Sequence, residues 1–310
     1  MEQRVVPGSS VRFSALTVTV DPPSVAPPSL DARVVAGLQR CRARGVVTFD
    51  VGDARFPERA ERLIAAAFPS PGPEVGVIVA RSVESLAGER RAGVNPSDPV
   101  QLEAAIEESL GGSRRRLGSV PVKVVEWRSS ATELSFPEGG RDTPPIPRLS
   151  DPATILALRL STGGRPPSGA SQPKVLFSGE LSLLDHSLES ILEQMAARHP
   201  IAFLARNPLA EGRLDGTRFS HSTALSGPGD GPIDLRRLRR EFDPVVRLGF
   251  LTAGHRRTLA QAALRFVLIR PWVVSAVVPL PAPERMDELL GFEASPPLDR
   301  EELERVYELK

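Results

Sequence analysis

Three charged residues each come directly after a stretch with strand-like composition. Asp50 follows one such stretch, Arg81 follows the next and Arg128 follows a third. Active sites of parallel α/β barrels lie at the carboxyl ends of the strands, so these positions could do chemistry. Two interpretations stay open: Asp50 and Arg81 form a structural ion pair, or Arg55, Arg81 and Arg128 form a pocket for a phosphate or carboxylate.

Residue types that usually carry acid–base chemistry are scarce in this chain. There is one tyrosine, Tyr307, close to the C-terminus, and no histidine precedes His186. The single cysteine, Cys41, excludes an internal disulfide framework and a multi-cysteine zinc site. Asp50 and Asp53 lack a histidine or a third clear carboxylate nearby, so we predict no metal site.

Charge and hydropathy narrow the class of protein further. Lys and Arg total 39 against 38 Asp and Glu, a balance that argues against a general nucleic-acid or membrane-surface binder. The chain contains no run of about 20 apolar residues, so we predict no membrane span. The first ten residues show no apolar signal-peptide core, so we expect a cytoplasmic protein. Only three of the basic residues are lysines, which with 31 prolines indicates the GC-rich genome of a bacterium.

Alternating strand and helix patterns predict the elements that position the charged residues. Eight strand-like runs, mostly separated by helical stripes, span about 280 residues and favour a closed (β/α)8 barrel of the α/β class. Residues 4–13 predict a hairpin that precedes it. We expect a single domain over 1–310, with flexible loops at 129–152 and 221–233. The first loop is rich in proline and glycine, so the fourth outer helix should be missing or shortened.

Several segments resemble the aldo-keto reductase family. Residues 201–214 resemble its seventh strand and the following "SPLxxGxL" loop, 257–279 resemble the next helix and eighth strand, and 45–50 resemble its "GvnffDTA" second strand. The resemblance implies a (β/α)8 barrel whose bottom is closed by an N-terminal hairpin. It also implies NAD(P)H-dependent carbonyl reduction.

The same resemblance implies that most of the family's catalytic tetrad is replaced. Asp50 matches its aspartate. No tyrosine stands near Arg55, where the acid should be; the position of the lysine holds Arg81, and Arg128 is the best match to the histidine. A phenol with an ordinary pKa near 10 needs a nearby cation to act as an acid near neutral pH, and here the phenol itself is missing.

Positions that bind the family's cofactor are also only partly kept. The resemblance assigns cofactor contacts to six residues: Ser161, Thr162, Ser178, Arg206, Leu209 and Arg285. Thr17–Thr19 replaces the family's Gly-x-Gly, and residues 279–283 lack its glycine and basic residue. We therefore predict no NADP(H) binding, or weak binding with a dissociation constant above about 100 μM.

Three functions remain open at this point. The barrel could have lost reductase chemistry and act by binding a small anionic ligand or a protein partner. It could be an NAD(P)H-dependent oxidoreductase of the family that uses a non-standard acid. A different reaction could be run from Asp50 and the arginines.

Overall fold

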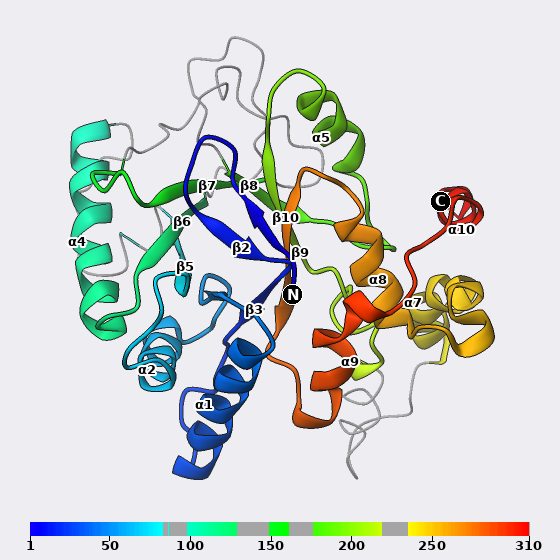
Figure 1. Ribbon diagram of the computed structural model, residues 1–310, viewed down its shortest axis with the longest axis horizontal. Coiled ribbons are helices and arrows are strands. Elements are labelled where there is room, and N and C mark those ends of the chain that lie inside the picture. The colour runs from blue at the N-terminus through cyan, green and yellow to red at the C-terminus, as the bar shows by residue number, and fades with distance from the viewer. Residues whose placement is uncertain (83–85, 87–97, 129–148, 161–175, 219–234, 310) are drawn as a thin grey trace.

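The computed structural model is a closed barrel of eight parallel strands surrounded by helices (Figure 1). It describes the chain except for residues 83–85, 87–97, 129–148, 161–175, 219–234 and 310. The barrel strands, in chain order, are β3 (Leu16–Thr19), β4 (Thr48–Asp50), β5 (Gly76–Ser82), β6 (Val122–Arg128), β7 (Ile155–Arg159), β8 (Leu176–Glu180), β9 (Ala202–Arg206) and β10 (Val273–Pro279). Each strand pairs with its neighbours in chain order, and β10 closes the ring on β3. The predicted fold class is confirmed.

Helices connect the strands and cover the outside of the barrel. Their bounds are α1 (Pro28–Ala43), α2 (Pro57–Ala67), α4 (Pro99–Leu117), α5 (Glu189–Ala196), α7 (Leu235–Arg247), α8 (Leu259–Leu268), α9 (Met286–Leu290) and α10 (Arg300–Glu308). Short 3₁₀ segments lie at Leu248–His255, Pro283–Arg285 and Phe292–Ala294. No helix in the described part of the chain is long and apolar enough to cross a membrane.

An N-terminal hairpin closes one end of the barrel. Strands β1 (Gln3–Val5) and β2 (Arg12–Ser14) pair antiparallel and lie across the end of the barrel that faces the viewer in Figure 1. Val6, Val11 and Phe13 of the hairpin share one buried cluster with inward residues of the barrel strands such as Ile78. The opposite end, where the strands have their carboxyl ends, is therefore the end left for a site.

Helix α4 shows how the outer layer meets the barrel. It begins at an N-cap, Asp98, whose side chain accepts hydrogen bonds from two backbone N–H groups of the first turn. It continues past Gly111 and Gly112 to Leu117. Tertiary contacts outweigh the helix cost of glycine here, since Leu117 and Ser113 are buried beyond that point.

Two predictions about the loops fall on residues that the structure does not describe. The missing or shortened fourth outer helix would lie between β6 and β7, where residues 129–148 are not described. The predicted loop at 221–233 lies outside the described residues as well.

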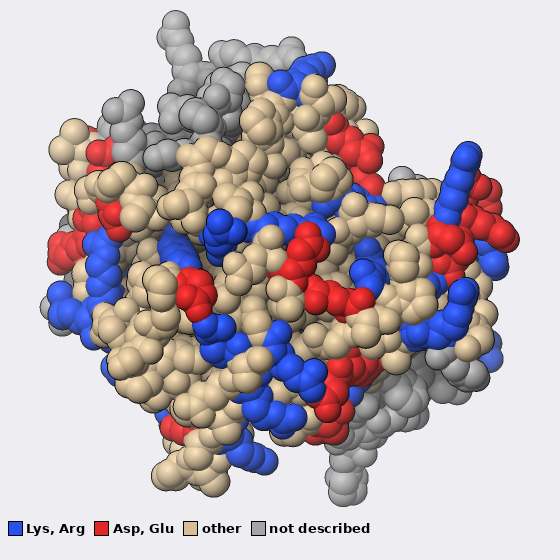
Figure 2. Space-filling view, in the orientation of Figure 1, with Lys and Arg blue, Asp and Glu red and all other residues tan. Residues whose placement is uncertain are grey.

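On the face that carries the hairpin, acidic and basic side chains are interspersed (Figure 2), as the even charge balance suggests.

Candidate functional site

The barrel interior changes from apolar to charged towards the carboxyl ends of its strands. Alternate residues of a strand point to the same face, so inward positions recur every second residue. One layer of the interior contains Val124, Ala157, Leu176 and Leu204. Two residues further along the same four strands come Glu126, Arg159, Ser178 and Arg206. The sequence thus places a polar layer directly above an apolar one.

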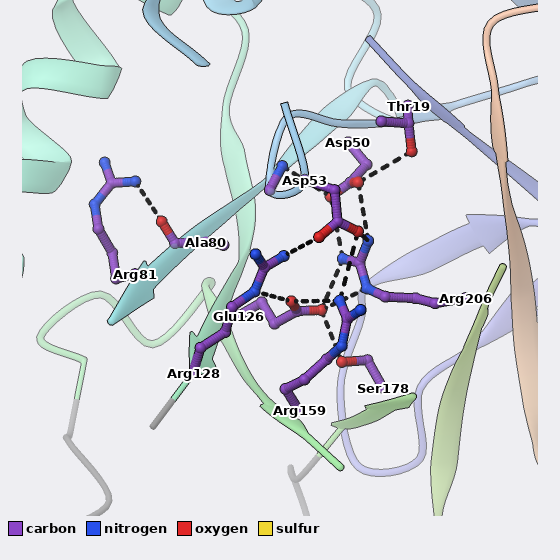
Figure 3. A network of polar contacts seen from close by, with 11 residues as sticks. Thr19, Asp50, Asp53, Ala80, Arg81, Glu126, Arg128, Arg159, Ser178 and Arg206 are labelled. Carbon is purple, nitrogen blue, oxygen red and sulfur yellow. Dashed lines mark hydrogen bonds and ion pairs between the residues drawn. The ribbon is translucent and has the colours of Figure 1, made fainter. Parts of the chain in front are cut away.

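Arg206, at the end of β9, is the centre of this polar layer (Figure 3). Its side chain is 2% exposed. Nη1 donates to Asp50 Oδ2 at 3.0 Å and Nη2 to Asp50 Oδ1 at 3.2 Å, a bidentate pair. Nε donates to Glu126 Oε2 at 2.7 Å, and Nη1 also donates to Asp53 Oδ2 at 2.5 Å. One guanidinium group thus binds three carboxylates.

Glu126, in β6, is a carboxylate that contacts three guanidinium groups. It is fully buried. Its Oε1 accepts hydrogen bonds from Arg128 Nε at 2.8 Å and Arg159 Nη1 at 3.2 Å. Its Oε2 accepts from Arg206 and, at 2.7 Å, from the hydroxyl of Ser178. Each oxygen of Glu126 thus accepts two hydrogen bonds, so this buried carboxylate has no lone pair left to bind a ligand.

Asp53 lies outside the barrel proper, on the connection between β4 and α2. Its Oδ1 accepts from Arg128 Nη2 at 2.6 Å, and its Oδ2 contacts Arg206 and, at 3.5 Å, Arg159 Nη1. Its side chain is 39% exposed, whereas the side chain of Asp50 is not exposed at all. Three carboxylates and three guanidinium groups therefore form one network with no net charge, which we call the mouth network (Asp50, Asp53, Glu126, Arg128, Arg159 and Arg206).

Electrostatics hold Glu126, Asp53 and Arg206 of the mouth network ionised. Burial alone would raise the pKa of Glu126, but the neighbouring guanidinium groups, that of Arg206 foremost, outweigh burial and hold this pKa well below its usual range. The same balance lowers the pKa of Asp53. Burial would lower the pKa of Arg206, yet the carboxylates around it raise that pKa well above its ordinary value. No member named here can release or take up a proton near neutral pH.

The expected pair between Asp50 and Arg81 is wrong. Asp50 accepts hydrogen bonds from Thr19 and the Gly52 backbone, and its cationic partner is Arg206. Arg81 points away from the network in Figure 3 and donates to Ser113 Oγ of α4 at 2.6 Å and to the Ala80 carbonyl. A shift of one residue along a strand moves a side chain to the other face.

Of the three arginines expected to share an anion pocket, only Arg128 lies in the mouth network. Arg55 bonds to Asp21 through its Nε at 3.1 Å, and its side chain is 71% exposed. Arg81 lies outside the barrel wall, as described above. The grouping of these three is therefore wrong, because two of them face away from the interior.

Glu126, Arg159 and the contacts of Asp53 with the arginines were not predicted from the sequence. The available signal was alternation along β6 and β7. A glutamate two residues after Val124 and an arginine two residues after Ala157 both fall on inward positions. Reading the charged residue inside each strand, rather than the one after it, would have found both.

The only tyrosine lies far from the mouth network in the fold. Tyr307, in α10, donates to Glu189 Oε1 at 2.7 Å and accepts from Arg270 Nη2 at 2.8 Å. His186 packs edge-on against its ring. Burial and the hydrogen bond to Glu189 raise the pKa of Tyr307 to about 12. These groups join the last helix to the outside of the barrel.

Residues that the resemblance assigned to cofactor contacts have other partners. Ser178 and Arg206 belong to the polar layer around Glu126. Leu209 is buried in the core. Arg285 donates to Glu288 Oε2 at 2.5 Å and to the Asp215 carbonyl at 2.5 Å. Ser161 and Thr162 lie outside the described residues.

An open groove of about 420 Å³ lies beside Arg285, where the resemblance implies the cofactor. Its charged lining residues are Arg213, Arg285, Asp215 and Glu288, two of each sign. A phosphate placed here would meet the carboxylate of Glu288 next to Arg285. At the nicotinamide end of the expected cofactor site, Arg206 is buried and cannot stack on a nicotinamide ring. The described residues therefore do not fit NADP(H).

A family model for the aldo/keto reductase family matches residues 170–310, which include β8, β9, β10 and the groove. With the closed barrel and its hairpin, this match supports membership of the aldo-keto reductase superfamily. No curated protein sequence matches it.

Solved aldo-keto reductases share its fold at low sequence identity. A thermostable aldo-keto reductase in complex with the inhibitor epalrestat is 15% identical over the whole of both chains, with a TM-score of 0.65. The holo form of an aldo-keto reductase from Bacillus halodurans is 15% identical over 100% of this chain and 96% of its own, with a TM-score of 0.66. A glycerol dehydrogenase from Gluconobacter oxydans is 16% identical over 99% and 94%, with a TM-score of 0.67.

In this barrel, the inward residue near the end of β5 is Ala80 rather than Arg81. A Cβ atom added to Gly52 would lie 3.2 Å from the Ala80 Cβ and 3.0 Å from Asp50 Oδ1, which places Ala80 at the edge of the mouth network. Ala80, one residue before the position that the resemblance gave to the tetrad lysine, thus presents its methyl group to the mouth.

Proposed function

We propose that this aldo-keto reductase barrel acts by binding a small anionic ligand or a protein partner, and that it does not reduce carbonyls. One observation carries the proposal. The inward positions at the carboxyl ends of the strands are occupied by the mouth network, in which carboxylates and guanidinium groups satisfy one another. A substrate carbonyl at this point would find ion pairs in place of a proton donor.

The ionisation of the network argues against a substitute acid. Reduction of a carbonyl needs a proton for the oxygen, and a general acid must hold that proton near the operating pH. The pKa values of Glu126 and Asp53 are both lowered by neighbouring arginines, so both carboxyls are deprotonated at neutral pH. A guanidinium group keeps its proton and cannot serve either. General acid catalysis supplies roughly 10²–10⁴-fold in rate, and this contribution should be missing.

The residues that the resemblance assigned to cofactor contacts support the same proposal. Arg285 is already bound to Glu288, and Arg206 is held inside the barrel by Asp50 and Glu126. A phosphate would have to break the first pair before it could gain the charge-assisted contact. We therefore propose that NADP(H) binding is weak or absent.

Steady-state reduction of a panel of aldehydes, followed by loss of NADPH absorbance, tests the proposed function. An active aldo-keto reductase assayed in parallel shows that the conditions support turnover. We expect the rate of this protein to equal the rate without enzyme. A rate well above background that falls in Asp50→Asn, with the fold intact by circular dichroism, would establish a reductase with a non-standard acid instead.

A further inference from the structure

We propose that Arg128, Arg159 and Arg206 form a binding site for the carboxylate group of a small ligand, which Asp53 occupies in the free protein. This inference deepens the proposed binding function and rests on it. In the structure, these three arginines already bind one carboxylate, that of Asp53. One Asp53 oxygen contacts Arg128 and the other contacts Arg206 and Arg159, at 2.6, 2.5 and 3.5 Å.

Exposure separates Asp53 from the other two carboxylates of the mouth network. Asp50 and Glu126 are fully buried, whereas the side chain of Asp53 is 39% exposed. The side chains of Arg128 and Arg159 are 30% and 26% exposed, so their guanidinium groups are within reach of solvent. Of the three carboxylates in the network, Asp53 is therefore the one whose place a ligand can reach.

Charge defines what the site accepts. Without Asp53 the network keeps two carboxylates, Asp50 and Glu126, and three guanidinium groups, so it carries a net charge of +1. One monovalent anion restores neutrality. Planar guanidinium groups that approach both oxygens of one anion match the flat geometry of a carboxylate. A small carboxylate is thus the class of ligand that fits.

Asp53 can leave its position with little change elsewhere. It lies on a short connection in which Arg55 is held by Asp21 and the Gly52 N–H by Asp50, while the Asp53 carboxylate bonds only to the three arginines. Rotation of its side chain would free the site and leave these backbone anchors in place. Because the competing carboxylate is tethered, it acts at a high effective concentration, and an external carboxylate must overcome it.

Removal of the tethered carboxylate tests this arrangement. In Asp53→Ala, Arg128 and Arg159 keep their bonds to Glu126, so the variant should fold. We expect sodium acetate to raise its melting temperature saturably relative to sodium chloride at equal ionic strength. The half-saturating acetate concentration should be lower than in the parent by roughly tenfold or more. The parent should show the same effect at higher acetate concentration.

Two further variants show where acetate binds. Glu304→Gln removes a carboxylate from the exposed pair with Arg300 in α10 and should respond to acetate as the parent does. Arg159→Gln in the Asp53→Ala background should abolish the acetate effect, since Arg159 Nη1 lies over the vacated position. Inorganic phosphate, used as a second probe, should bind more weakly than acetate, because it is larger than the Asp53 carboxylate and its second negative charge exceeds the +1 charge of the site.

Several results would overturn the inference. The absence of a saturable effect of acetate on Asp53→Ala, or of any effect on the parent at any concentration, would contradict the site. So would an equal gain in Glu304→Gln, or acetate binding that survives Arg159→Gln. Tighter binding of phosphate than of acetate would contradict the carboxylate class. These titrations contain no cofactor, so they test the carboxylate site independently of reductase activity. If acetate binds as expected but the protein reduces aldehydes, the carboxylate site is supported and the proposed loss of reductase chemistry is wrong.

Discussion

Replacement of the buried glutamate of the mouth network should destabilise the protein strongly. Glu126→Gln keeps the size of the side chain and removes one negative charge. The charge is fully buried and accepts hydrogen bonds from Arg128, Arg159 and Arg206. The network then carries three guanidinium groups against two carboxylates, and the new amide N–H₂ faces donors. Removal of one member of a buried ion pair costs about 3–5 kcal/mol, because the partner charge stays buried.

The structure places the expected value within that range. Charge-assisted hydrogen bonds contribute about 1.5–3 kcal/mol each, which would give a larger sum over three arginines. Arg128 and Arg159 are 30% and 26% exposed, however, so water partly screens their share. The bond from Arg206 is not screened in this way. We therefore expect a loss of about 3–5 kcal/mol in the free energy of unfolding, measured by urea denaturation at neutral pH.

A matched variant and the pH dependence sharpen this test. Glu304→Gln removes the same charge from an exposed pair with Arg300 and should change stability by less than about 1 kcal/mol. The pKa of Glu126 is lower in the folded protein than its ordinary value of 4.5. The stability it contributes is therefore complete above that value and is lost as pH falls towards the folded pKa. The difference between parent and Glu126→Gln should shrink in acid. A loss below about 1 kcal/mol at neutral pH would refute the buried network.

Three further outcomes follow from the described contacts. Arg206→Lys should cost about 2–4 kcal/mol in urea unfolding, because one ammonium group cannot span three carboxylates as a guanidinium does; an unchanged midpoint would contradict that role. The single tyrosine, Tyr307, should titrate near pH 12 in an ultraviolet absorbance titration, and a midpoint near 10 would mean that its bond to Glu189 is absent. The thiol of Cys41, whose pKa burial raises to about 12, should react with a thiol reagent only after unfolding; rapid reaction of the native protein would contradict its burial.

The fold could be predicted because strands and helices leave local patterns. Each of the eight expected strand runs forms a strand of the barrel. Gly45 lies in the turn directly after α1 with φ at 94°, a conformation that favours glycine. The extent of α4 could not be predicted. Its continuation past two glycines depends on packing that only the assembled barrel provides.

The candidate site was predicted only in part, for a reason of geometry. Asp50, Arg128, Ser178 and Arg206 were all named from the sequence, and the structure brings them together. Their partners were assigned wrongly, because a strand's face is set by register and one residue separates inward Ala80 from outward Arg81. The contact of Asp53 with arginines from three different strands depends on the closure of the barrel, which no local pattern contains.

Direct titration with NADPH tests the central proposal, that this barrel does not support NADPH-dependent reduction. Binding is followed by cofactor fluorescence, with Arg285→Ala and Arg213→Ala as variants of the groove. We predict a dissociation constant above about 100 μM for the parent and no further weakening in either variant. Binding in the low micromolar range that is lost in Arg285→Ala would show that this arginine leaves Glu288 to hold a phosphate, and would contradict the account.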